Sequence, residues 1–185
     1  MRVIFLRKTN YHEHWMKLRK MNSDNRNLPE FKKIIELEKI SQKQGSGISF
    51  DELIGTWKFE SVCKKDSDEV DNISSSLLQV LSAKLELKRK ISEKLRIYQI
   101  KNSISFGLIS VIFTGNAYLK GSRPILIFYF DSLRVSIGKF PMFNKSLNKP
   151  NEKKSPFFSL IGICEEGNWM CARGRGGGLA IWTKS

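Results

Sequence analysis

Apolar and polar residues alternate along most of the chain after Leu53, as they do in strands that bury one face. The clearest inward-facing sets are Trp57, Phe59 and Ser61, then Ala83, Leu85 and Leu87, then Leu95 and Ile97. Longer β-prone runs cover 110–119 and 124–137, and two final strands are expected near 157–164 and 169–182. Short strands at this spacing predict a closed or nearly closed antiparallel barrel.

Glycines mark the two ends of this β-rich region. Gly55-Thr-Trp57 opens the first strand, where we expect Trp57 to lie in the core. Arg173-Gly-Arg-Gly-Gly-Gly178 divides the last two strands, and a tight hairpin turn requires a residue with positive φ. We therefore expect a positive φ at one of the last three glycines of that run.

A helix is predicted before the strands. Asn27-Leu-Pro-Glu30 has the composition of a helix start, in which Asn27 caps and Pro29 occupies the first turn. The apolar positions that follow recur at helical spacing, and Gly45-Ser-Gly47 ends the helix. A second short helix is expected over 73–81, and a long loop with three prolines over 140–156.

These elements divide the chain into three parts: a basic flexible tail at 1–26, the N-terminal helix and linker at 27–47, and the barrel domain at 48–185. The tail is rich in lysine and arginine and poor in acids, which is typical of disordered segments. A true start at Met16 or Met21, or a transit-like segment, are alternative interpretations of the tail.

Charge narrows the choice of partners. The chain carries 32 lysines and arginines against 18 acids, a formal net charge of +14. An anionic membrane, an acidic protein and a nucleic acid all fit such a charge. No run of 18 apolar residues is present, so no transmembrane helix is expected. Cys63, Cys164 and Cys171 are expected to be reduced thiols, since their spacing suits no metal site.

Catalytic residues are scarce in the β-rich part. The two histidines, His12 and His14, both lie in the tail, where no other ligand type completes a metal site. General acid–base or nucleophilic catalysis needs a positioned and activated group. We therefore expect a protein that is not an enzyme and that holds no metal.

The order of several short motifs resembles a known family. These motifs are Gly55-Thr-Trp57, Phe113-Thr-Gly115, Ile125–Ile137, Arg173-Gly174 and Gly178-Leu-Ala-Ile-Trp182. The chain resembles the plastid lipid-associated protein (fibrillin) family of cyanobacteria and plastids, whose fold is a lipocalin-like β-barrel. Met170 stands where that family commonly has an arginine, and Arg175 where it commonly has an acid.

The resemblance implies non-catalytic binding of a lipid, isoprenoid or pigment at an anionic thylakoid membrane. The protein would be peripheral, on the cytoplasmic side of that membrane or in the plastid stroma, with no cofactor besides the bound molecule. Arg173 or Arg175 is expected over the ring of Trp57, as in other lipocalin-like barrels. The expected ligand pocket consists of Trp57, Phe59, Phe113, Phe128, Phe130 and Arg173.

The segment expected as a loop combines lysines with large apolar residues. Between 139 and 154 five lysines stand against one glutamate, an excess of +4. Each basic residue near an anionic bilayer contributes about 1 kcal/mol of attraction, and aromatic residues suit the interface. The expected membrane or partner contacts are Lys139, Phe140, Met142, Phe143, Lys145 and Lys149.

Three other functions fit parts of the sequence. A basic adaptor bound to a larger photosynthetic protein complex would use the same charge. A bilin lyase shares the lipocalin-like barrel and would use a cysteine. A nucleic-acid-binding module would use the arginine–glycine run and aromatic residues on an exposed sheet face. Nucleic acid is the weakest candidate partner, because Phe106, Phe113 and Tyr118 lie on strands expected to face the core.

Overall fold

The computed structural model describes residues 28–63, 83–90, 97–121, 124–164 and 168–185. This part of the chain contains one α-helix, α2 (Phe31–Gln44), a 3-10 turn, η1 (Glu152–Lys154), and nine strands. The strands are β1 (Gly55–Cys63), β2 (Lys84–Lys90), β3 (Ile97–Phe106), β4 (Ile109–Lys120), β5 (Ile125–Ile137), β6 (Phe140–Ser146), β7 (Phe157–Cys164), β8 (Trp169–Gly174) and β9 (Leu179–Lys184). The tail at 1–26, the helix expected over 73–81 and Leu95 lie outside the described residues.

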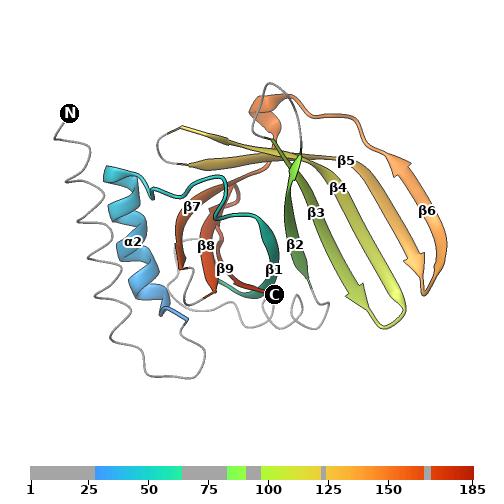
Figure 1. The fold of residues 1–185 in the computed structure, drawn as a ribbon, viewed down its shortest axis with the longest axis horizontal. Coiled ribbons are helices and arrows are strands. Elements are labelled where there is room, and N and C mark those ends of the chain that lie inside the picture. Colours follow the sequence, from blue (N-terminus) through green and yellow to red (C-terminus); the bar gives the residue numbers. More distant parts are fainter. Residues whose placement is uncertain (1–27, 64–82, 91–96, 122–123, 165–167) are drawn as a thin grey trace.

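Eight of the strands form a closed circuit of hydrogen-bonded neighbours, which we call the strand ring (Figure 1). The circuit runs β1–β2–β3–β4–β5–β7–β8–β9, and β9 pairs again with β1. All of these pairings are antiparallel, and β6 pairs with β5 outside the circuit. The predicted mainly β fold with a preceding helix is thus confirmed, and its barrel-like form corresponds to this ring.

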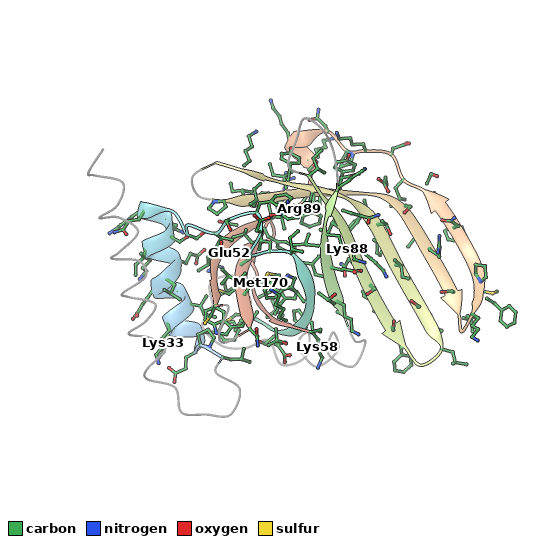
Figure 2. The ribbon with its side chains drawn as sticks, viewed as in Figure 1. Lys33, Glu52, Lys58, Lys88, Arg89 and Met170 are labelled. Atoms are coloured by element: carbon green, nitrogen blue, oxygen red, sulfur yellow. The ribbon has the colours of Figure 1, made fainter. Side chains whose placement is uncertain are left out.

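Two apolar clusters hold the fold together. The larger one fills the strand ring, where Met170 lies between the strands in Figure 2. Its members include Phe50, Trp57, Phe59, Tyr98, Phe128, Leu160 and Trp182. The smaller cluster packs α2 onto the outer side of the ring and includes Ile34, Leu37, Ile161, Trp169, Cys171 and Ile181. An eight-stranded ring is just wide enough for side chains to fill its interior.

A β-bulge in β1 interrupts the alternation that was predicted for this strand. Trp57 and Phe59 face the interior as predicted, but the register against β9 shifts between Phe59 and Ser61. The extra residue, Glu60, accepts a hydrogen bond from the Thr183 hydroxyl at 2.6 Å. Beyond the bulge the faces exchange, so Val62 packs on the interior cluster in place of Ser61.

Strand β3 also differs from the expected pattern. Ile97 is half-buried, whereas Tyr98 and Ile100 are fully buried in the ring interior. Tyrosine tolerates this position because its hydroxyl donates to the Phe50 carbonyl at 2.7 Å. The two aromatic rings stack with centroids 3.7 Å apart. The segment that precedes β1 therefore covers the interior at this point.

Helix α2 ends where expected but begins later. Its N-cap is Glu30, with extended backbone and no side-chain cap, in place of the expected Asn27. The residue before a proline avoids helical backbone, which disfavours a helix start ahead of Pro29. At the other end Gly45 has a φ of 83° and donates its N–H to the Ser41 carbonyl at 2.8 Å.

The prediction of a long loop over 140–156 is wrong. Residues 140–146 form β6, which continues a hairpin from β5 through a turn at Gly138. Pro141 is compatible with this strand because β6 pairs with β5 alone among the described strands and sits at the sheet edge. The remainder of the segment contains η1 before the chain enters β7.

The glycine-rich hairpin between β8 and β9 has the expected conformation. Gly177 has a φ of 88°, and its N–H donates to the Gly174 carbonyl at 2.9 Å. Arg173 fixes the turn further by donating from Nη1 to the Gly177 carbonyl at 2.6 Å. The prediction of a positive φ within this run is confirmed.

Replacing Gly177 with alanine should therefore lower the free energy of unfolding by about 1 kcal/mol, since a Cβ is strained at positive φ. Gly176→Ala is the matched control, because a Cβ there meets no heavy atom within 4 Å. Thermal unfolding of both variants measures the difference. Equal melting temperatures for the two variants would show that the turn does not require this backbone conformation.

Candidate functional site

Strands β3 to β6 extend beyond the strand ring as an open four-stranded layer, on the side away from α2 (Figure 1). β5 makes this possible by changing partner along one edge. It pairs with β7 through 125–127 and with β6 through 132–137, while β4 follows its other edge throughout. We call residues 101–114 and 132–146 the outer sheet.

A bulge separates the outer sheet from the ring. Gly115 lies opposite Phe130 and Thr114 opposite Ser132, which leaves Asp131 as the extra residue. The strands approach so closely here that a Cβ on Gly115 would lie 2.7 Å from the Phe130 Cα. The glycine of the Phe-Thr-Gly motif is therefore required by backbone packing.

The register of the outer sheet places its apolar residues on one face. Residues directly opposite each other in antiparallel pairs point to the same side. The apolar face carries Ile104, Phe106, Ile109, Val111, Phe113, Leu133, Val135, Ile137, Phe140 and Phe143. The opposite face carries mostly polar residues, among them Lys101, Ser103, Ser110, Thr114, Ser132 and Arg134. None of these apolar residues belongs to either of the two apolar clusters, so we take this face as the candidate site.

A row of aromatic side chains connects the apolar face with the ring interior. Its members are Phe113, Phe130, Phe128, Phe158, Trp182 and Phe59. Successive ring centroids are 5.3, 5.6, 5.0, 5.3 and 6.4 Å apart, which are ordinary distances for tilted aromatic pairs. Phe113, Phe130 and Phe158 are half-buried, whereas the other three are buried. The row thus begins on an open surface and ends in the core.

Three residues of the expected pocket, Trp57, Phe59 and Phe128, belong to the packed core. Trp57 is 1% exposed and donates its indole N–H to the Leu53 carbonyl at 3.0 Å. Phe59 is 6% exposed and packs edge-on against Trp182. Phe113 and Phe130, the remaining aromatic residues of the expected pocket, lie together with Phe128 in the aromatic row.

Arg173 lies apart from these aromatic residues. It lies two residues after Cys171 and therefore on the same outer face of β8, which packs against α2. Its guanidinium donates two hydrogen bonds of 2.5 Å to Glu38 of that helix. The cation that the structure places over the Trp57 ring is Lys184, at 5.3 Å from the centroid. Arg173 therefore joins the helix to the ring, because a bidentate pair of this kind fixes orientation.

The expected membrane-contact residues are exposed, as their role requires. Phe140 is 75% exposed, Met142 63% and Phe143 50%. Lys139 lies in the turn before β6, and Lys145 near the end of β6 is also exposed. Lys149 follows the strand, with its ammonium 4.6 Å from the centroid of the Tyr129 ring.

The charge of the outer sheet is of one sign. It contains Lys101, Arg134, Lys139 and Lys145, and its sequence includes no aspartate or glutamate. Asp131 sits just inside its boundary, where it accepts a hydrogen bond from Asn116 at 3.1 Å. Glu86 of β2 lies opposite Lys101 and offsets its charge, with 3.8 Å between the carboxylate and the ammonium. Arg134, Lys139 and Lys145 remain, and an apolar layer flanked by these basic residues attracts anionic surfaces.

The described residues offer little support for a nucleophilic cysteine or a metal site. None of the three cysteines forms a disulfide, and burial raises the pKa of the Cys171 thiol far above its ordinary value. A buried thiol of this kind is a poor nucleophile. The described part of the chain brings no three His, Cys, Asp or Glu side chains together as a metal site. Nor does it include a helix long and apolar enough to cross a membrane.

The β3–β4 hairpin was missed by the sequence interpretation. Phe106, Leu108 and Ile109 are 59%, 73% and 47% exposed, although these strands were expected to face the core. The alternation of Ile104 and Phe106 with polar residues correctly indicates one apolar face. The local sequence does not show that these strands extend beyond the strand ring, where their apolar face is exposed.

Comparison with known proteins adds no relative: no family model matches the chain, and no curated protein matches its sequence. The resemblance to the plastid lipid-associated proteins therefore stays a hypothesis carried by the motifs alone.

Proposed function

We propose that this chain is a non-catalytic, lipocalin-like protein that binds a lipid, isoprenoid or pigment molecule at the surface of an anionic membrane. The observation that carries the proposal is the open apolar face, which the aromatic row joins to the ring interior. An apolar surface that the described helix and strands leave open is costly in water, and a bound apolar molecule lowers that cost. The family resemblance points to the thylakoid as the membrane.

The chemistry of the apolar face supports binding over catalysis. Apart from Lys145, which lies opposite Leu133 at its edge, the residues on this face do not ionise near neutral pH. General acid–base catalysis requires such groups within reach of the substrate. Aliphatic and aromatic side chains instead contact long hydrocarbon or prenyl chains by area alone.

The membrane part of the proposal rests on β6. Phe140 and Phe143 project from an edge strand whose neighbouring charges are Lys139 and Lys145. Aromatic rings beside lysines are the usual composition of surfaces that lie in a bilayer interface. The protein is thus proposed as a peripheral membrane protein that exchanges its apolar ligand with that bilayer.

Substitution on the apolar face tests ligand binding. Phe113→Ser should weaken the binding of cis-parinaric acid, a fluorescent apolar chain, by about tenfold, the effect of losing one buried aromatic contact. Ile112→Ser is the matched control, because Ile112 is the next residue of β4, is also half-buried and points to the opposite face. Thermal unfolding confirms that both variants fold.

An equal loss of affinity in both variants, or no binding by the parent chain, would contradict the proposal. The second outcome would favour the basic adaptor instead. One observation supports that alternative independently, since β6 forms the end of the sheet and its outer edge has no strand partner among the described residues. Such an edge can pair with a strand of another protein.

A further inference from the structure

Large apolar side chains gather at one end of the outer sheet. All seven that are highly exposed among the described residues lie in or next to two hairpin turns. They are Phe106, Leu108, Ile109, Ile137, Phe140, Met142 and Phe143, and we call them the apolar tip. Exposed apolar residues are ordinarily scattered over a surface, so their concentration at one end requires an explanation.

The two hairpins of the tip are joined into one rigid end. Ile109 of β4 lies opposite Ile137 of β5, and the Gly138 N–H donates to the Leu108 carbonyl at 2.7 Å. Each hairpin turns at a glycine of positive φ, Gly107 at 56° and Gly138 at 57°. A preformed end of this kind loses little conformational entropy when it binds.

Two residues of the apolar tip, Leu108 and Met142, are not part of the apolar face. Phe140 and Phe143 lie on the apolar face, opposite Ile137 and Val135, but Met142 is the extra residue of a bulge between them. Leu108 stands in the turn itself, 73% exposed. A partner that lies flat against one face would leave these two residues in water, whereas insertion of the end covers them all.

The charge around the tip selects an anionic surface. Lys139 lies in one turn, and Arg134 and Lys145 lie further back, with no acid in the outer sheet. A second copy would bring like charges together, and the whole chain carries +14. A lysine near inserted apolar residues can extend its ammonium to lipid phosphates.

We propose that the apolar tip inserts end-first into an anionic lipid bilayer, and that the β3–β4 hairpin is a membrane anchor equal to β6. This extends the membrane part of the proposed function, on which it rests. Insertion is shallow, about 5–10 Å, because the outer edge of β6 has no strand partner among the described residues and hydrocarbon cannot satisfy its backbone groups. The end of the ligand-binding face that carries the apolar tip then contacts the bilayer.

Vesicle binding by the full chain tests the anchor. Leu108→Ser should weaken binding to vesicles of phosphatidylglycerol and phosphatidylcholine by about tenfold at high salt, where the charge attraction is screened. Leu108→Trp should bind like the parent, and brominated acyl chains should quench its added fluorescence. Gln99→Trp is the control, because Gln99 is exposed on the ring portion of β3, the strand that leads to the Leu108 turn, and a tryptophan there should not be quenched.

The outcomes separate this proposal from ligand binding. Vesicle binding that is unchanged by Leu108→Ser, together with no quenching at Leu108→Trp, overturns the β3–β4 anchor while membrane docking through β6 stands. Failure of the parent to bind anionic vesicles overturns both membrane claims, whereas the parinaric acid assay of Phe113 is unaffected. A dimer in vesicle-free solution that Leu108→Ser dissociates would identify a second copy as the occupant and overturn the proposal.

Discussion

Replacing Trp57 with alanine is expected to lower the free energy of unfolding by about 3–5 kcal/mol, as large-to-small changes of buried aromatic residues do. The indole is 1% exposed at the centre of the ring cluster, and Lys184 covers part of its ring. The substitution also removes the hydrogen bond to the Leu53 carbonyl. Thermal unfolding should show a decrease of roughly 10 °C for a chain of this size.

A conservative variant separates the two contributions of Trp57. Trp57→Phe keeps an aromatic ring in the cluster but removes the indole N–H, so its cost should be about 1–2 kcal/mol. A melting shift below about 3 °C for Trp57→Ala would mean that the residue is not part of the core. It would then become a candidate for direct ligand contact.

Gly115→Ala is expected to have an effect of similar size, at least about 3 kcal/mol. A Cβ at this position would lie 2.7 Å from the Phe130 Cα and 2.8 Å from the Tyr129 carbonyl carbon. Both are backbone atoms, so the strands must separate at the bulge between the ring and the outer sheet. Denaturant unfolding measures the change in stability.

The control for Gly115 is another glycine at a strand position. A Cβ on Gly174, the last residue of β8, would find its nearest neighbours at 3.8 and 3.9 Å, which is ordinary contact. Gly174→Ala should therefore unfold almost like the parent. If Gly115→Ala were as stable as Gly174→Ala, the close approach of β4 and β5 would not be a property of the folded chain.

The sequence predicted the elements of this fold better than their relative faces. Runs of β-prone residues correctly identified β4 and β5, although a bulge at Asp131 interrupts the period of two in β5, and the glycine run identified the hairpin between β8 and β9. Alternation correctly identified β2. It was wrong at Ser61 because a single bulge exchanges the two faces of β1, and nothing local in Phe59-Glu-Ser61 announces a bulge. Strand β6 was taken as a loop because the prolines and lysines of the segment 140–156 are unusual in strands, except at an edge.

The candidate site was predicted in part for a similar reason. Phe113, Phe128 and Phe130 were chosen as apolar residues of inward-facing strands, and pairing of β4 with β5 does bring them together. Arg173 was chosen by analogy with other barrels. Its partner in the structure is Glu38 of α2, and the sequence did not predict that this helix packs against β8. The β3–β4 end of the tip depends on how far the strands extend beyond the ring, which is a tertiary property.

The most direct test of the ligand-binding account is native mass spectrometry of the full chain after incubation with lipids and pigments extracted from a thylakoid membrane. The account predicts a mass increase corresponding to one apolar molecule per chain, reduced in Phe113→Ser and kept in Ile112→Ser. A chain that stays at its own mass of 21.3 kDa under all lipid conditions would contradict the account.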